Sequence, residues 1–205
     1  GKVLLYDVNR DLKRTVVPIS SISRHLKNAV VAIEDDNFYN HHGIEPTAIL
    51  RAGFADIFSG SKAQGGSTIT QQVVKNTLLT KDKAYTRKIK EIVLALRLEK
   101  IKSKDEILEL YLNEAPFGGP IYGAEEASRA FFGVPASDLS LAQAAYLAAL
   151  PQAPTYFSPY GNNRIALDGR KNLVLSRMEL LGFISREEGG AAKKEVVLFV
   201  PQKEQ

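Results

Sequence analysis

Helical periodicity runs through most of this 205-residue chain and constrains its fold more than any other feature. Apolar side chains return every three or four residues in successive segments, the spacing that places them on one buried face of a helix. The segments expected to be helical cover residues 23–35, 45–60, 67–79, 81–103, 103–118, 123–133, 140–151 and 164–185. Residues 1–20 and 193–205 are expected to be extended. The sequence therefore predicts a mainly α fold.

Polar residues mark where several of these helices begin. Ser23 is the expected N-cap of the first helix, because Ser at this position can bond to free backbone N–H groups. Thr68 with Gln71, and Ser103 with Glu106, have the spacing of a capping box, in which each partner bonds to the other's backbone N–H. These local signals predict the starts of three helices.

The composition is that of a folded globular protein, with 44% hydrophobic and 24% charged residues. The absence of cysteine excludes disulfides and thiolate zinc sites. A net charge of +4 suits an anionic partner such as phosphate, nucleic acid or an acidic membrane surface. Basic residues are not clustered with aromatic ones, which disfavours nucleic-acid binding. No run reaches the roughly 20 apolar residues that span a bilayer.

An apolar run leads directly into three acidic residues, Glu34, Asp35 and Asp36. Because Glu34 ends an apolar helix and the next two residues add like charge, we expect its pKa to be raised. A raised pKa suits a general acid or base near neutral pH, whereas the alternative is an exposed helix-terminal acid. The adjacent His41 and His42 are interpreted as fixing the loop by hydrogen bonds rather than as metal ligands.

The segment 81–103 places Arg87, Lys88 and Glu91 on one helix face. The two cations favour the ionised form of Glu91 and lower its pKa. Such a face is either a solvated, salt-bridged surface or an anion site beside a charged acid. The contrast between this acid and Glu34 is the pattern of divided acid and base roles.

A glycine-rich stretch leads into the helix at 67–79 and predicts a second anion site. Glycines let backbone N–H groups approach a ligand, and a helix N-terminus favours anions. The nucleotide P-loop pattern is absent, and an ordinary capped helix is the alternative. Together, the two basic faces indicate a phosphate-bearing substrate. The candidate ligands on this helix and loop are Gly66, Ser67, Thr68, Gln71, Gln72 and Lys75.

Five motifs in this order resemble those of the peptidoglycan glycosyltransferases, glycosyltransferase family 51. They are EDDNFYNHHG, GGSTITQQVVKN, RKIKEIVLALRLEK, ILELYLNEAPFGGPIYGAEEASRAFFG and LSLAQAAYLAALPQAP, within residues 34–154. The resemblance implies one domain over residues 1–205, with a lysozyme-like head and a small membrane-facing jaw lobe at about residues 44–80. An N-terminal transmembrane anchor and any transpeptidase domain would lie outside this chain.

The resemblance also implies the reaction and the partners. Such an enzyme polymerises lipid II into β-1,4-linked glycan, with inversion and release of undecaprenyl pyrophosphate. The implied partners are lipid II, undecaprenyl-pyrophosphate-linked glycan, the membrane surface through the apolar jaw, and other cell-wall synthesis proteins, with no nucleic acid. The implied location is the outer face of the bacterial cytoplasmic membrane, and no organic cofactor is implied.

On the same resemblance, Glu34 is the general base and Glu91 is the second catalytic acid. Glu91 either holds a divalent cation, Mg²⁺ or Mn²⁺, on the pyrophosphate, or it positions Lys88 and Arg87 and stabilises positive charge on the donor sugar. Contacts to phosphate or sugar are expected from Lys88, Arg87, Lys75, Ser67, Thr68, Gln71, Gln72 and Gly66. His41, Phe38, Arg51 and Asn113 are weaker candidates.

Two other functions remain open on the sequence alone. A lysozyme-like muramidase or lytic transglycosylase would share the fold and a catalytic Glu, but it cleaves glycan and needs no pyrophosphate site. A non-catalytic lipid-pyrophosphate-binding module would keep Lys75 and Lys88 but would not need Glu34.

Overall fold

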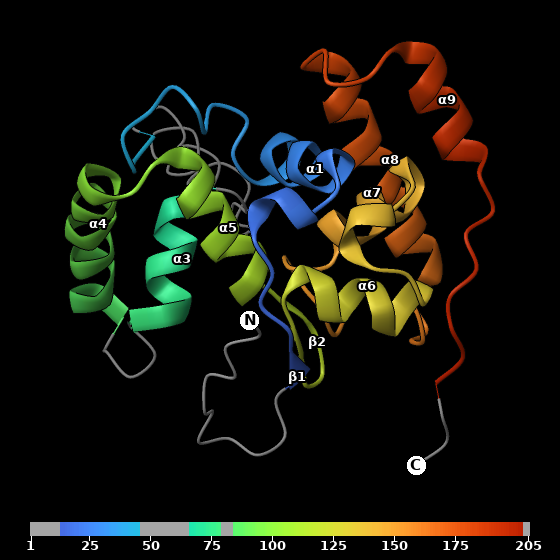
Figure 1. Cartoon of the computed structure of the whole chain (residues 1–205), viewed down its shortest axis with the longest axis horizontal. Coiled ribbons are helices and arrows are strands. Elements are labelled where there is room, and N and C mark those ends of the chain that lie inside the picture. Colours follow the sequence, from blue (N-terminus) through green and yellow to red (C-terminus); the bar gives the residue numbers. More distant parts are fainter. Residues whose placement is uncertain (1–12, 46–65, 79–83, 203–205) are drawn as a thin grey trace, which may run out of the picture. The chain divides into compact units, whose positions relative to one another are not determined.

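The computed structural model describes residues 13–45, 66–78 and 84–202 (Figure 1). Contacts within the chain form two compact units, one of Gly1–Ile33 with Ala115–Gln205 and the other of Glu34–Glu114. The expected helix at 45–60 and the candidate Arg51 lie outside the described residues. The single domain with a jaw lobe near residues 44–80 stays a prediction, because much of that lobe also lies outside them.

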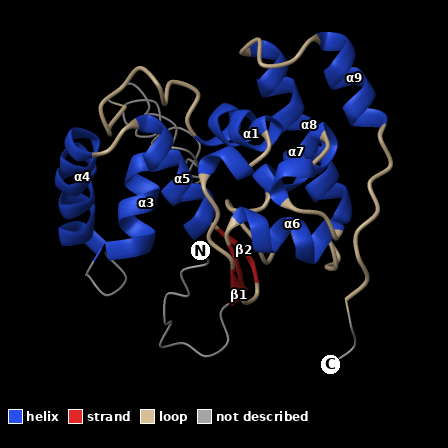
Figure 2. Cartoon of the chain, in the orientation of Figure 1, coloured by secondary structure: helices blue, strands red, loops and turns tan. Residues whose placement is uncertain are grey.

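The first unit combines helices with one small sheet, as Figure 2 shows. The sheet has the order β1-β3-β2, with β1 parallel to β3 and β2 antiparallel to it. Sequence periodicity missed this sheet because its strands are too short to show alternation. The elements of this unit are β1 (Lys13–Arg14), η1 (Ile19–Ser21), α1 (Arg24–Glu34), β2 (Pro116–Gly118), β3 (Ile121–Tyr122), α6 (Ala124–Phe132), η2 (Ala136–Asp138), α7 (Leu141–Ala149), α8 (Arg164–Leu180) and α9 (Arg186–Lys194). The last residue of α1, Glu34, belongs to the second unit.

The core of this unit is built around α7, which packs against α6, α8 and α9. Nearly every residue of α7 is buried, as expected for a helix that is apolar on all sides. A capping box between Ser140 and Gln143 starts the helix. Small alanine side chains let the neighbouring helices approach closely, and Leu167, Val174 and Leu175 of α8 fill the space between them.

Helix α9 differs from the expectation that the helical part ends at residue 185. Its two adjacent glycines lower helix propensity, and this hid the helix from periodicity. A capping box between Ser185 and Glu188 starts the helix, and Lys193 and Lys194 complement its C-terminal dipole. A Cβ at Gly189 would collide with the carboxylate of Glu179 on α8, so glycine permits close packing there. Residues 195–202 have no regular secondary structure.

The second unit contains α3 (Ile69–Leu78), α4 (Ala84–Ile101) and α5 (Lys104–Glu114). Helix α3 packs against both α4 and α5, and the three lie side by side in Figure 1. Val74 of α3 and Ala95 of α4 are buried together, with Leu94 and Leu98 packed against them. Most of the expected helices are present, and the mainly α fold is confirmed.

The predicted caps are also confirmed. Ser23 Oγ accepts the His25 backbone N–H at 3.2 Å. Thr68 N–H donates to Gln71 Oε1 at 2.9 Å, and Gln71 N–H donates to Thr68 Oγ1 at 3.1 Å. Ser103 and Glu106 make the same reciprocal pair, with distances of 2.8 and 3.3 Å.

Candidate active site

Glu34 is the last residue of α1, and its half-buried carboxylate is held by α3. Gln72 Nε2 donates to Glu34 Oε2 at 2.8 Å. The amide of Gln72 is thus directed at the candidate base, and its expected contact with phosphate or sugar stays a prediction. A neutral donor of this kind fixes the orientation of a carboxylate without adding a positive charge beside it.

Asp35 and Asp36 do not surround Glu34 with like charge in the way the sequence suggested. Asp35 is buried, accepts the Ile69 backbone N–H at 2.9 Å, and lies 2.9 and 3.0 Å from His41 Nε2. His41 Nδ1 accepts the Gly43 N–H at 3.1 Å, so the hydrogen bonds assign the ring proton to Nε2. Asp36 is exposed. The interpretation of His41 as a loop-fixing residue is confirmed.

Three backbone N–H groups at the N-terminus of α3 are bonded by the protein's own side chains. Asp35 accepts the first helical N–H, and the Thr68 and Gln71 capping box uses two more. Thr68 Oγ1 also donates to the Gly43 carbonyl at 2.7 Å. An internal carboxylate therefore already interacts with the helix dipole there, and the expected contact of this helix end with an external phosphate stays a prediction. Thr68 is 2% exposed and Gln71 is fully buried, and their expected contacts with the substrate stay predictions.

Lys88 and Glu91 form an asymmetric ion pair on α4. Lys88 Nζ donates to Glu91 Oε1 at 2.6 Å and to Ser67 Oγ at 2.9 Å. The lysine side chain is 45% exposed whereas that of Glu91 is 4% exposed. A solvated salt-bridged surface would expose both partners, so this pair is better described as a cation presented to solvent by a buried acid. The ammonium has three N–H donors and retains the capacity to bind an anion.

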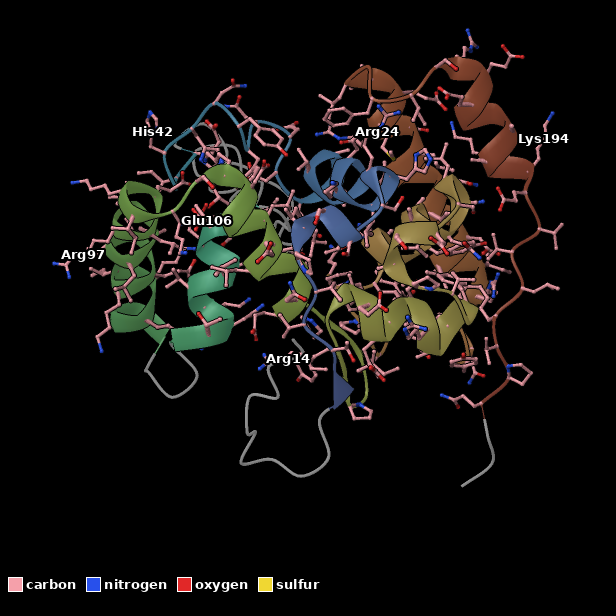
Figure 3. All side chains as sticks on the ribbon, viewed as in Figure 1. Arg14, Arg24, His42, Arg97, Glu106 and Lys194 are labelled. Carbon is pink, nitrogen blue, oxygen red and sulfur yellow. The ribbon has the colours of Figure 1, made fainter. Side chains whose placement is uncertain are left out.

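The other candidates fall into two groups. Arg87 is half-buried one position before Lys88, Lys75 is exposed in the last turn of α3, and Gly66 is half-buried before that helix. By contrast, Phe38 is fully buried, and Asn113 is 4% exposed with its Nδ2 donating to the Glu109 carbonyl. Phe38 and Asn113 are therefore enclosed in this unit, and their expected contacts with the substrate stay predictions. The side chain of His42 is exposed, and Figure 3 labels it.

Sequence reasoning missed a further buried acid, Glu99 of α4. Its Oε1 accepts the Thr70 hydroxyl at 2.6 Å and the Lys104 ammonium at 2.7 Å. The signal was present, because Glu99 closes the third motif and lies on the buried side of α4 near Ala95. Lys104 Nζ in turn lies 4.6 Å from the centroid of the Phe38 ring.

The acidic residues of this unit are candidate ligands for a divalent cation. Mg²⁺ and Mn²⁺ require several hard oxygen ligands. Within the described ranges, no group of three or more His, Asp and Glu side chains converges on one point. Glu91 Oε1 is also already bound by the Lys88 ammonium. These residues do not fit a metal held by protein ligands alone, and no chemical step is routed through one.

Among the described helices, none is long and apolar enough to cross a membrane.

Comparison with known proteins gives a consistent result. Residues 2–179 match the family model described as transglycosylase. The chain is 47% identical over 188 residues to penicillin-binding protein 1A of Aquifex aeolicus, an alignment covering 92% of this chain and 26% of that protein. It is 48% identical over 179 residues to a putative transglycosylase of Cupriavidus necator, covering 87% of this chain and 77% of that protein.

A solved structure supports the same relationship. The crystal structure of penicillin-binding protein 1A from Haemophilus influenzae matches with a TM-score of 0.56 and 26% sequence identity, covering 93% of this chain and 19% of that chain. The chain spans 26% of the length of the Aquifex aeolicus relative and 20% of penicillin-binding protein 1A/1B of Bacillus subtilis.

Proposed function

Because the chain belongs to the transglycosylase family, we propose that it polymerises lipid II into β-1,4-linked glycan with Glu34 as its general base. The family places it among the peptidoglycan glycosyltransferases, and the mainly α, lysozyme-like fold agrees with the resemblance in its motifs. The observation that carries the proposal is that one unit contains both functional groups. Gln72 orients the carboxylate of Glu34, and the buried Glu91 holds the exposed ammonium of Lys88.

Glu34 accepts the proton of the attacking hydroxyl in this proposal. The carboxylate that takes this proton is held by Gln72, which donates to its Oε2. A fixed carboxylate loses less orientational freedom when it engages the hydroxyl of the acceptor sugar, and this lowers the barrier to proton transfer. The hydroxyl oxygen then bonds to the anomeric carbon of the donor from the side opposite the leaving group. The configuration at that carbon inverts as the bond to pyrophosphate breaks.

Lys88 stabilises the negative charge that develops on the leaving pyrophosphate. A preorganised cation near a developing anion is among the largest contributions to catalysis. Ser67 and Glu91 hold the ammonium from two sides, which fixes its position before the substrate arrives. Of the two roles considered for Glu91, its contact with Lys88 supports positioning of the cation. Arg87 and Lys75 supply further positive charge to the phosphates.

The partners and location of the chain are proposed with the reaction. The lipid tails of the substrate require the active site to work at a membrane surface, on the outer face of the bacterial cytoplasmic membrane. Helix α4 exposes Ile89, Val93 and Leu96 at helical spacing. The cations Lys90, Arg97 and Lys100 are exposed on the same helix, and Figure 3 shows Arg97 directed away from it. This mixture of apolar and basic side chains suits an anionic lipid surface. Other cell-wall synthesis proteins stay predicted partners.

Turnover of lipid II in detergent tests the proposed function. The parent chain is expected to form glycan polymer, and Glu34→Gln is expected to lose at least about 100-fold of that rate, because an amide cannot act as the base. Glu187→Gln removes an exposed acid from α9 and serves as the matched control. Equal polymerisation by the parent and Glu34→Gln would contradict the assignment of the base.

The same preparation distinguishes the two other functions. A muramidase or lytic transglycosylase would release fragments from preformed glycan and leave lipid II unchanged. A binding module would bind lipid II without consuming it. A lysine placed for pyrophosphate favours the polymerising enzyme over a glycan-cleaving one, since cleavage of a sugar–sugar bond has no phosphate leaving group.

A further inference from the structure

The buried carboxylate of Glu99 joins three parts of the second unit through one oxygen. Glu99 belongs to α4, Thr70 to the first turn of α3, and Lys104 to the first turn of α5. We propose that Glu99 is a positioning residue for glycosyl transfer, which orients the base Glu34 through Thr70 and Lys104. This inference rests on the proposed function, because it assigns Glu99 a part in that reaction.

Thr70 provides the first connection. Its side chain is fully buried, and its hydroxyl donates to Glu99 Oε1 at 2.6 Å. The same turn of α3 carries Gln72, which holds Glu34 at 2.8 Å. A rotation or shift of this turn would move the Gln72 amide relative to Glu34. The bond between Thr70 and Glu99 therefore fixes the turn that orients the base.

Lys104 provides the second connection. Its ammonium lies 2.7 Å from Glu99 Oε1 and 4.6 Å from the centroid of the Phe38 ring. Phe38 is fully buried in the turn that follows Glu34. A cation held over an aromatic ring favours one position of that ring. Glu99 thus also stabilises the chain on the C-terminal side of the base.

Gly43, in the segment 35–45 that follows the base, lies against the same acid. Gly43 has a φ of 89°, and a Cβ at this position would lie 2.9 Å from the Ala95 carbonyl oxygen and 3.1 Å from Glu99 Cγ. The Gly43 carbonyl accepts the Thr68 hydroxyl at 2.7 Å. The stem of Glu99 is therefore packed against the segment that carries Gly43, and its carboxylate accepts a hydrogen bond from Thr70 of α3.

The negative charge of Glu99 is needed as well as its shape. The side chains of Glu99 and Lys104 are 6% and 19% exposed. Removing one charge from such a pair leaves the other poorly solvated and drives it toward water. In Glu99→Gln the amide can still accept the Thr70 hydroxyl, but Lys104 loses its counter-charge. We expect Lys104 to move away from the Phe38 ring, and the segment 35–45 that follows the base to lose its fixed position.

Kinetics of lipid II polymerisation provide the first test. Glu99→Gln is expected to lower kcat roughly 10- to 100-fold because a small misplacement of the base has a large effect on rate. The KM for lipid II is expected to stay within about threefold of the parent value, because Glu99 does not touch the substrate. Thr70→Val is also expected to lower kcat. Thr70→Ser keeps the hydroxyl and is expected to have a kcat close to that of the parent.

A matched control separates positioning from general loss of stability. Glu179→Gln removes the acid from the pair of Lys193 and Glu179, whose atoms are 2.8 Å apart in the other unit. Both Gln variants are assayed at a temperature where circular dichroism shows each fully folded. A kcat decrease for Glu99→Gln no larger than that of Glu179→Gln would overturn the proposal. If Glu99→Gln does not fold, the comparison of Thr70→Val with Thr70→Ser decides in its place.

The side-chain amide of Gln72 gives a readout that does not depend on activity. Its ¹⁵N–¹H signals, assigned by their loss in Gln72→Met, report the bond to Glu34. In Glu99→Gln and Thr70→Val, these signals are expected to move toward the values of a solvent-exposed amide. Unchanged signals would overturn the proposal, whether or not the parent polymerises lipid II. Shifted signals in a chain whose parent does not polymerise would contradict the proposed function alone and support the connection from Glu99 to Glu34.

Discussion

The ammonium of Lys88 and the carboxylate of Glu91 lie 2.6 Å apart, yet the lysine side chain is 45% exposed and that of the acid 4%. Most ion pairs between partners on one helix are exposed on both sides and contribute little to stability. This pair is different because the acid lies inside the unit and fixes the direction of the cation. Its asymmetry leaves the lysine accessible to the pyrophosphate of the proposed reaction.

Lys88→Met is expected to lower kcat for lipid II polymerisation by roughly 100- to 1000-fold, because it removes the charge that stabilises the leaving pyrophosphate. The measurement is steady-state turnover in detergent. The control is Lys102→Met, which breaks an exposed ion pair. The side chains of Lys102 and Glu106 are 41% and 49% exposed. If both variants lose activity equally, Lys88 has no special role.

Gln72→Met is expected to lower kcat roughly 10-fold or more, because Glu34 loses the donor that fixes its orientation. Gln72→Glu should be more severe, since it places a second carboxylate beside the base. Binding of lipid II, followed by fluorescence of a labelled substrate, should change little in Gln72→Met. A large loss of binding with unchanged kcat would instead return Gln72 to the substrate-binding role suggested by the sequence.

The two adjacent glycines of α9 are expected to respond in opposite directions to alanine. Gly190→Ala meets no atom within 4 Å and should raise the free energy of unfolding by about 0.5–1 kcal/mol through helix propensity. Gly189→Ala has the same gain in helix propensity, but it forces the Glu179 carboxylate away from Lys193. This overpacking should outweigh the gain, for a net decrease in the free energy of unfolding of roughly 1 kcal/mol. Chemical denaturation of both variants measures the difference. Stabilisation by both would mean that α9 does not pack closely on α8.

Acid sensitivity is expected from the capping-box glutamates. The hydrogen bonds from Lys102 and Ser103 lower the pKa of Glu106 to about 2 from its usual 4.5, and bonds from Ser185 lower the pKa of Glu188. A lowered folded-state pKa contributes stability above pH 4.5, and this contribution is lost as the pH falls toward 2. Between these pH values, the melting temperature of the double variant Glu106→Gln/Glu188→Gln should therefore fall less steeply with decreasing pH than that of the parent. An unchanged pH dependence would show that other groups control acid unfolding.

Membrane association is expected to require the exposed apolar residues of α4. Ile89→Ser/Val93→Ser should reduce sedimentation of the chain with vesicles that contain phosphatidylglycerol, because these side chains are 67% and 43% exposed. Ile165→Ser is the control, since Ile165 of α8 is 89% exposed. Equal loss of sedimentation in the control and the double variant would contradict a specific α4 surface.

Sequence alone predicted the features that depend on local spacing. The capping boxes at Thr68 and Ser103 follow from residues three positions apart, and the pair of Lys88 and Glu91 follows from helix geometry. Helix α9 could have been found in the same way, because Ser185 and Glu188 have capping-box spacing. Its two glycines outweighed that signal when propensity was considered alone.

Contacts between distant residues could not be predicted in this way. The side chains of Gln72 and Glu34 are separated by 38 positions, and those of Thr70 and Glu99 by 29. Local spacing also does not reveal that Asp35 occupies the N-terminus of α3, which made that helix end look available for phosphate. The types of residue at the site were visible in the sequence, but the tertiary fold decides which of them face the substrate.

The internal capping of α3 by Asp35 has a consequence for inhibitor design. Backbone N–H groups at a helix end would select for the tetrahedral shape of a phosphate, because their directions are fixed. A lysine ammonium acts as a compact point charge with little directional preference. A site that depends on Lys88 should therefore tolerate anions of different geometry, so that sulfonates or paired carboxylates could replace pyrophosphate in a competitive ligand.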